Sequence, residues 1–297
     1  MKDAPLIWTD GLTKRYGKME AVRNLYLMVR PNRITGFLGR NGAGKSTTIK
    51  MILGMIRPTS GEGTAFGKRI TDAADSIEIR RRIAYVSKDK RLYDYMTVEQ
   101  MVRFTGAFYP DWRPEVVTRL LKEYELPSNR RVRALSKGMR TKLALLLAFA
   151  RRPDLLILDE PSEGLDPVGV EQLLQTLVGK CTEGTTVFFS SHQIDEVERI
   201  ADHVSILEKG SLVLDESLDR LRQTYRRIDA VFPSAPVERE FQIAGVERIR
   251  TNGRQMSVFA SSNADAVVER AHSCNAISVQ ASPVGLRDLF LESVKEN

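Results

Sequence analysis

Residues 39–47 form a glycine-rich stretch that matches a phosphate-binding loop pattern at every fixed position. Its sequence is Gly39-Arg40-Asn41-Gly42-Ala43-Gly44-Lys45-Ser46-Thr47. Glycines let main-chain N–H groups approach an anion closely, because no Cβ lies between the backbone and the phosphate oxygens. Lys45 supplies a mobile positive charge, and the Ser46 hydroxyl can ligate Mg²⁺, which prefers oxygen ligands. The stretch therefore predicts a site for a nucleotide phosphate and its magnesium ion.

The segments on either side of this loop are those that a phosphate site requires. Residues 34–38 are an apolar run typical of a buried strand, and residues 48–55 have the apolar spacing of a helix that ends near Pro58. The loop would then lie at a helix N-terminus, whose dipole favours an anion. This context disfavours the alternative, a glycine-rich turn with an incidental lysine.

Two acidic residues follow a second apolar run. Residues 155–158 predict a strand in the middle of a parallel sheet, and Asp159 and Glu160 come directly after it. Asp159 can hold Mg²⁺, directly or through water, while Glu160 can orient and polarise the water that attacks a γ-phosphate. Two acids at a strand end are common in isolation, but beside a phosphate loop they predict a hydrolytic site.

The remaining pattern places these residues in an α/β fold. Strands and helices alternate between residues 155 and 207, which predicts a P-loop NTPase core with a mainly parallel sheet. Residues 6–30 predict an antiparallel β subdomain, in which Tyr16 either stacks on adenine or packs at the surface; its position alone favours neither. An inserted helical lobe is predicted at about residues 89–150, where Thr97 begins a helix with apolar residues through Phe108.

The character of the chain changes near residue 218. A hairpin is predicted around Asn252-Gly253, followed by a helix at residues 265–271, a strand at 277–279 and a helix at 286–294. We therefore expect an ATP-binding domain at residues 1–217 and a small α+β accessory domain at residues 218–297.

The composition of the 297-residue chain is that of a globular protein, with 42% hydrophobic and 28% charged residues. Its longest apolar run, residues 143–150, is too short to cross a bilayer, and no signal-peptide pattern opens the chain, so we expect a cytoplasmic protein. The net charge is +7, but lysine and arginine are scattered, and no direct nucleic-acid partner is expected. Cys181 and Cys274 lie far apart, without the paired spacing of a zinc or dithiol site.

The segment upstream of the second apolar run resembles the signature of the ATP-binding subunits of ABC transporters. It reads Leu135-Ser136-Lys137-Gly138-Met139-Arg140, where family members usually have L-S-G-G-Q. Residues 164–167 are similar to the family's D-loop, and His192 is similar to its switch histidine. Motifs in family order extend this resemblance over roughly the first 215 residues.

The resemblance implies a dimer in which two subunits sandwich two ATP molecules, each held with Mg²⁺ between the loop of one subunit and the signature of the other. Tyr16 then becomes the favoured adenine-stacking residue. The implied nucleotide-binding residues are Tyr16, residues 39–47, Ser136, Lys137, Gly138 and Asp166; the metal ligands are Ser46 and Asp159; the catalytic residues are Lys45, Glu160 and His192. A separate integral-membrane permease is the other implied partner, with the ATPase at the cytoplasmic face of the membrane.

The chain departs from the family pattern in two motifs. Lys137 and Met139 change the signature, although an additional cation beside a γ-phosphate is chemically tolerable. Lys88 stands where relatives usually have a glutamine, whose carbonyl can coordinate Mg²⁺, whereas a lysine ammonium cannot. Lys88 would then face a phosphate or a partner, or leave the Mg²⁺ contact to water or Asp89.

The C-terminal residues 286–291 are loosely similar to the tails of two-component exporters of drugs, lipids or polysaccharides, which favours an exporter subunit. One alternative is a soluble ABC ATPase that acts on ribosomes or DNA, although the chain has one ATPase half and no sustained heptads. The other alternative is a catalytically weak regulatory subunit, which Lys88 and Lys137 would favour.

Overall fold

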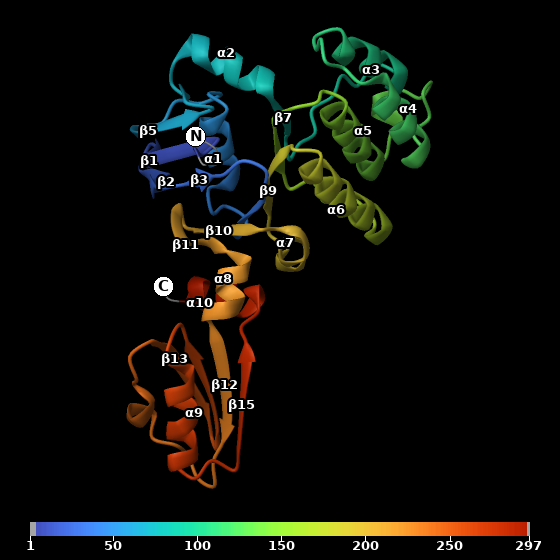
Figure 1. Ribbon diagram of the computed structural model, residues 1–297. Helices are drawn as coiled ribbons and strands as arrows, with labels where there is room; N and C mark the ends of the chain where they lie inside the picture. Colours follow the sequence, from blue (N-terminus) through green and yellow to red (C-terminus); the bar gives the residue numbers. More distant parts are fainter. Residues whose placement is uncertain (1–3, 296–297) are drawn as a thin grey trace. The chain divides into compact units, whose positions relative to one another are not determined.

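The structure is a computed structural model that describes residues 4–295, with side chains through residue 290. The chain divides into two compact units, Met1–Asp215 and Glu216–Asn297 (Figure 1). Each unit has its own hydrophobic core. Among the described residues, every helix is too short or too polar to span a bilayer.

Six strands form the central sheet of the first unit. In spatial order they are β11 (Ser211–Ser217), β10 (His203–Glu208), β4 (Ile34–Leu38), β9 (Thr186–Ser191), β8 (Leu155–Asp159) and β7 (Ile83–Val86). The pairings from β10 through β7 are parallel, and every residue of β4, β8 and β9 is buried. The carboxyl ends of parallel strands meet at one edge of a sheet, so the loops that follow β4, β8 and β9 lie together.

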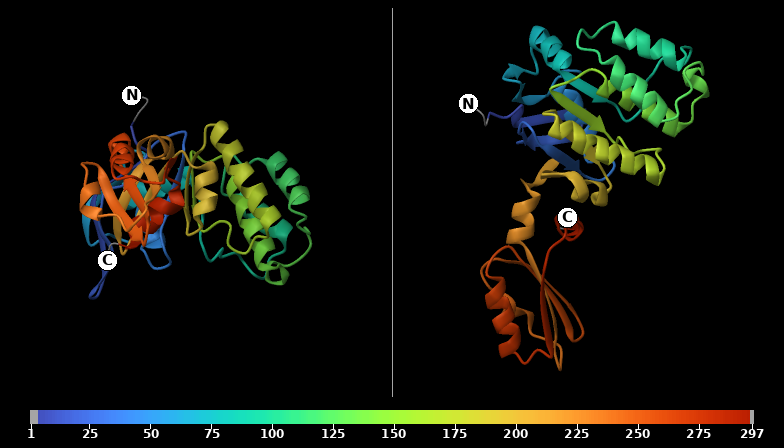
Figure 2. Two further views of the ribbon diagram at one scale, coloured as in Figure 1. Left: turned by 90° about the horizontal axis from the view of Figure 1, so that it is seen from below. Right: turned by 45° about the vertical axis from the view of Figure 1, so that its right-hand side comes forward.

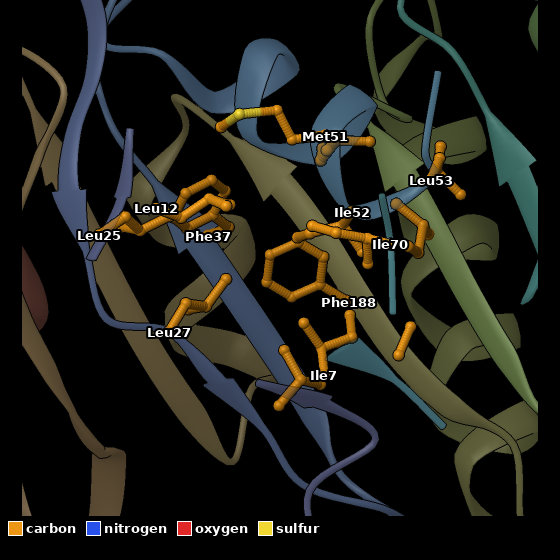
Figure 3. Packing of buried hydrophobic residues seen from close by; sticks show 14 of the residues in the cluster. Ile7, Leu12, Leu25, Leu27, Phe37, Met51, Ile52, Leu53, Ile70 and Phe188 are labelled. Atoms are coloured by element: carbon orange, nitrogen blue, oxygen red, sulfur yellow. The ribbon is translucent and has the colours of Figure 1, made fainter. Parts of the chain in front are cut away.

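An antiparallel sheet forms the amino-terminal part of the same unit. Its strands are β2 (Met19–Leu25), β1 (Ile7–Tyr16), β5 (Ser60–Ala65) and β6 (Lys68–Arg69), with β3 (Met28–Val29) also paired to β1. Figure 3 shows how Leu12 and Leu25 of this sheet share one core with Phe37 and Phe188 of the parallel sheet. The two phenylalanine rings lie 5.3 Å apart between centroids.

Four helices accompany these two sheets: α1 (Lys45–Ile52), α2 (Ala73–Arg82), α6 (Pro167–Thr182) and α7 (Ile194–Ile200). Helix α2 is absent from the elements predicted from the sequence. It buries only Ser76 and Ile79, so its apolar period is weak, but the Asp72 carboxylate accepts hydrogen bonds from two main-chain N–H groups at its start. The Asp72 cap is the feature of the sequence from which this helix could have been predicted.

A helical lobe follows β7 and consists of α3 (Val98–Gly106), α4 (Pro114–Glu123), the short 3₁₀ helix η1 (Val132–Ala134) and α5 (Lys137–Phe149). These helices lie together on one side of the first unit in both views of Figure 2. The predicted cap is confirmed, since Thr97 and Gln100 form a reciprocal capping box. The helix ends at Gly106, however, and does not reach Phe108. A Cβ on Gly106 would lie 3.0 Å from the indole nitrogen of Trp112, which packs on this last turn.

The second unit is a four-stranded antiparallel sheet with helices. The strand order is β13 (Val246–Asn252), β14 (Gln255–Ala260), β12 (Arg226–Val231) and β15 (Ser278–Pro283). Its other elements are α8 (Leu218–Thr224), the 3₁₀ helix η2 (Glu238–Phe241), α9 (Ala264–Ser273) and α10 (Leu286–Lys295). The predicted hairpin is present, but Asn252 pairs with Gln255, so Gly253 and Arg254 form its two-residue loop. The fold class predicted from the sequence is confirmed by these sheets and helices.

Candidate nucleotide site

The glycine-rich loop connects β4 to α1, and its glycines are required for two different reasons. A Cβ on Gly39 would lie 2.5 Å from the Leu207 carbonyl oxygen, and a Cβ on Gly44 would lie 2.3 Å from the Ala21 carbonyl oxygen. Gly42 has open space around it but adopts a φ of +84°, which L side chains rarely adopt. Backbone packing thus explains Gly39, backbone conformation explains Gly42, and both explain Gly44, whose φ is +110°.

This loop forms one wall of an open cavity of about 560 Å³. The sequence-predicted residues that line it are Tyr16, Arg40, Asn41, Gly42, Gly44, Lys45, Ser46, Thr47 and Glu160, and Lys88 lines it too. Arg23 and Lys209 were not predicted from the sequence; both line the same cavity, where Arg23 is paired with Glu20 and Lys209 adds positive charge. They come from β2 and from the turn after β10, and no short-range pattern points to them. The Gly210 N–H donates to the Ala43 carbonyl at 2.9 Å, which fixes that turn against the loop.

Glu160 lies between Lys45 and His192. The Lys45 ammonium is 3.1 Å from Glu160 Oε1, and His192 Nδ1 is 2.7 Å from Glu160 Oε2. Only 3% of the Glu160 side chain is exposed. Burial by itself would raise the pKa of Glu160, but Lys45 and His192 outweigh it and hold the pKa below its ordinary value. The carboxylate is therefore kept ionised, with Oε2 hydrogen-bonded to His192 and Oε1 held by the ion pair with Lys45.

Hydrogen bonds also fix the main chain at Glu160. Glu160 has a φ of +50°, and its N–H donates to the carbonyl and hydroxyl oxygens of Ser190. The Ser190 hydroxyl donates in turn to Asp159 at 2.6 Å, which connects β9 with the end of β8. The Glu160 carbonyl accepts a hydrogen bond from the ammonium of Lys90 at 3.0 Å, a contact that no pattern in the sequence predicts.

A second buried carboxyl group belongs to Glu196, whose hydrogen-bond partners lie near Glu160 and His192 in the sequence. Glu196 of α7 accepts hydrogen bonds at one oxygen from the Ser162 hydroxyl at 3.0 Å and the Ser191 hydroxyl at 3.1 Å. Its other oxygen, Oε1, has no hydrogen-bond partner in the described part of the chain. Burial raises the pKa of Glu196, against the effect of the two hydroxyls. Glu196 therefore links the loop after β8 to the segment that carries His192.

The predicted signature residues lie in a separate hollow of about 400 Å³. Ser136, Lys137, Gly138 and Asp166 line this hollow and do not line the cavity of the phosphate loop. Ser136 begins α5 by accepting the Met139 N–H, and Asp166 begins α6 by accepting the Gly169 N–H at 2.7 Å. Ser136 thus presents the N-terminus of α5, where an anion is favoured, whereas the Asp166 carboxylate itself caps the N-terminus of α6.

The two unusual lysines face one carboxylate. Lys137 Nζ lies 2.7 Å and Lys88 Nζ 4.0 Å from Glu163, which follows β8. The Lys137 side chain also packs over Gly164, where a Cβ would lie 2.8 Å from its Cγ. Asp89 is exposed and lies 3.6 Å from Arg91. Glu163 therefore offsets part of this extra positive charge, and the hydrogen bond from Lys137 lowers the pKa of Glu163.

Comparisons with known proteins agree with this geometry. A sequence model of the ABC transporter family matches residues 22–163. The bacitracin transport ATP-binding protein BcrA of Bacillus licheniformis is 35% identical over 225 residues, which cover 75% of this chain and 73% of that protein. The chain belongs to the ABC transporter ATP-binding family.

Other relatives of this family extend the similarity. The uncharacterized ABC transporter ATP-binding protein YcbN of Bacillus subtilis is 29% identical over 98% of both chains. Among solved structures, an ATP-binding subunit of an ABC transporter has a TM-score of 0.67 at 30% identity and covers 73% of this chain and 92% of that chain. The dimeric bacterial ABC transporter cassette MJ0796 has a TM-score of 0.66 at 26% identity, over 71% of this chain and 98% of that one.

The family binds nucleotide, typically with Mg²⁺, and the donor atoms here suit that pair. Ser46 offers a hydroxyl oxygen in the cavity wall, and Asp159 offers a buried carboxylate at the end of β8. These are oxygen donors of the kind that Mg²⁺ prefers, alongside phosphate and water. Lys88 has only donor hydrogens and cannot be a ligand.

Proposed function

We propose that this protein binds and hydrolyses Mg·ATP as one of two ATPase subunits that power a separate permease. The observation that carries the proposal is the convergence of Lys45, Glu160 and His192 beside the phosphate loop, with distances of 3.1 and 2.7 Å to the two oxygens of one buried carboxylate. This arrangement also argues against a catalytically weak subunit, because the three groups that hydrolysis requires are held together.

In the proposed reaction, water attacks the γ-phosphorus of ATP, and the bond from that phosphorus to the bridging oxygen of ADP breaks. Glu160 orients the water and accepts its proton, while His192 keeps the carboxylate aimed at the cavity. Lys45, which also donates to the Gly39 carbonyl at 2.6 Å, exchanges its contact with Glu160 for the phosphates. Magnesium, when held by Ser46 and Asp159, would neutralise phosphate charge.

The proposed active site is completed by a second subunit. Ser136, Lys137, Gly138 and Asp166 line a hollow of their own, so within one chain these residues do not line the cavity of the phosphate loop. A second ATPase subunit, identical or related, would place its signature residues across the γ-phosphate, where the N-terminus of α5 favours an anion. That a relative was solved as a dimer supports this arrangement.

We further propose that the chain is an exporter subunit at the cytoplasmic face of the membrane. A relative named for bacitracin transport supports a transport role. The helical lobe carries exposed rings at Tyr93, Tyr95, Phe104 and Phe108, which contact one another at centroid distances of 5.1 to 5.8 Å. An exposed aromatic cluster of this kind is typical of a protein–protein contact surface, which suits a permease.

Replacement of Glu160 by glutamine tests the hydrolytic role. E160Q should retain ATP binding, lose hydrolysis by roughly a hundredfold or more, and accumulate as an ATP-bound dimer. The control is E171Q, since Glu171 lies in an exposed ion pair with Arg199. Unchanged hydrolysis by E160Q would remove Glu160 from its proposed role.

Copurification tests the partner. The tagged protein should be recovered from detergent-solubilised membranes with a multi-span protein that stimulates its ATPase activity. Recovery with ribosomes or DNA, and without such a membrane protein, would contradict the transport role and favour a soluble ABC ATPase.

A further inference from the structure

Lys90 is a buried lysine on the loop after β7, and the proposed reaction gives it no task. We propose that Lys90 is a positioning residue, which holds the main chain of Glu160 in the conformation that aims its carboxylate at the phosphate loop. The inference rests on the proposed function of Glu160 as the group that activates water.

The contact between the two residues is direct. Lys90 Nζ donates to the Glu160 carbonyl oxygen at 3.0 Å, across 70 residues of sequence. Lys90 is only 6% exposed, so its ammonium is withdrawn from bulk water. A lysine that served only to fill space would bury its chain and keep its charge in solvent. Burial of the ammonium therefore indicates that Lys90 serves as a hydrogen-bond donor inside the protein.

Glu160 needs such a contact because of its backbone. Its φ of +50° lies in the left-handed region, which is unfavourable for a residue with a side chain. Residues held in that region persist only where the surroundings fix them. Ser190 holds the Glu160 N–H. The Glu160 carbonyl accepts from Lys90 at 3.0 Å and, less closely, from the Glu163 N–H at 3.3 Å, so Lys90 supplies the shorter contact and the one from a distant part of the sequence.

Charge explains why a cation is tolerated there. Burial lowers the pKa of Lys90 below its ordinary value, and the nearby Lys137 acts in the same direction, while the carboxylates of Glu163, Asp159 and Glu160 oppose this lowering. The loop itself is constrained, since Lys90 has a φ of +44° and its N–H donates to the Ser87 carbonyl at 3.0 Å. The neighbouring Lys88 differs, because its side chain is 40% exposed and faces Glu163.

Replacement by methionine, K90M, removes the ammonium and keeps the length of the side chain. We expect kcat to fall roughly ten- to a hundredfold, because a small displacement of the activating group is costly. The KM for ATP and the Kd of a fluorescent ATP analogue should change by less than about twofold, since phosphate binding does not depend on the orientation of the Glu160 carboxylate. K90R, which keeps a cationic donor, should retain more activity than K90M. The matched control is R91M, because Arg91 is adjacent, exposed and paired only weakly with Asp89.

A double-mutant comparison separates positioning from general stability. In the E160D protein the carboxylate is already displaced, so K90M should cost much less there than in the wild-type protein. An equal fold-loss of kcat in both backgrounds would contradict the inference, as would wild-type kcat in K90M. If K90M does not fold, the same comparison is made with K90R and K90Q, and a kcat equal to wild type in both would overturn it. Failure of the proposed function is distinguishable, because wild-type protein and E160Q would then hydrolyse ATP equally.

Discussion

His192 Nδ1 lies 2.7 Å from Glu160 Oε2, while the Lys45 ammonium holds the other oxygen of the same carboxylate. His192 follows β9 and Glu160 follows β8, so two adjacent parallel strands bring the pair together. The imidazole must carry its proton on Nδ1 to donate to the carboxylate. This relationship makes His192 the residue that sets the direction of the Glu160 side chain from outside the phosphate loop.

Loss of His192 should therefore impair the chemical step. H192A is expected to lower the kcat for ATP hydrolysis about a hundredfold, with little change in the Kd for ATP, because the carboxylate loses one of its two orienting contacts. H192Q retains a hydrogen-bond donor and should lose less. Steady-state ATPase assays check both variants, and equal activity of H192A and wild type would show that the contact is dispensable.

Loss of Lys45 should destabilise the nucleotide-free protein. K45M leaves Glu160 buried without its cationic partner, which is expected to cost about 3 kcal/mol of unfolding free energy. Addition of E160Q removes the unpaired charge and should recover most of that loss. Urea unfolding of the wild type, both single variants and the double variant measures the coupling. If the losses of unfolding free energy in K45M and E160Q simply add in the double variant, the ion pair between Lys45 and Glu160 makes no net contribution to stability.

The raised pKa of Glu196 predicts that the difference in stability between the wild-type protein and the E196Q variant depends on pH. Burial raises its pKa above the ordinary 4.5, so the folded state binds the proton more tightly than the unfolded chain does. The folded protein thus loses stability as the pH rises from 4.5 through the raised pKa, and above it the loss is complete. E196Q should therefore be more stable than wild type, by about 1 kcal/mol near pH 8. The advantage should disappear below pH 4.5. Thermal unfolding across this range tests it, and a constant difference would contradict the titration of Glu196.

The phosphate loop offers a matched pair of glycine substitutions. G39A places a Cβ 2.5 Å from the Leu207 carbonyl, so the backbone must shift, and we expect a loss of about 3 kcal/mol together with weakened ATP binding. G42A meets nothing within 4 Å and carries only the cost of its left-handed φ, about 1 kcal/mol. Unfolding free energies and ATP affinities check the order, which would be wrong if G42A were the more damaging change.

The sequence by itself determined the parts of this protein that depend on local pattern. Residues 39–47 specify a phosphate loop because glycine, lysine and serine act at fixed spacing along one turn. The apolar run that ends at Asp159 predicts a buried parallel strand, and Thr97 with Gln100 predicts the start of α3, since capping uses residues three apart. Helix α2 was not predicted, because its weakly apolar, arginine-rich segment shows little periodicity. Strand β12 was not predicted either, because its alternation is confined to Ile228 and Ala230 after two arginines.

Only the tertiary structure decided how the separate segments meet. Lys90 and Glu160 are 70 residues apart, and parallel strands β7 and β8 bring them within a hydrogen bond. Lys88 and Lys137 read in the sequence as two unrelated departures from a family pattern, yet Glu163 faces both. Burial and long-range contacts set the direction of each pKa shift and the strained backbone at Glu160, because these depend on which charges and dipoles surround a group in space.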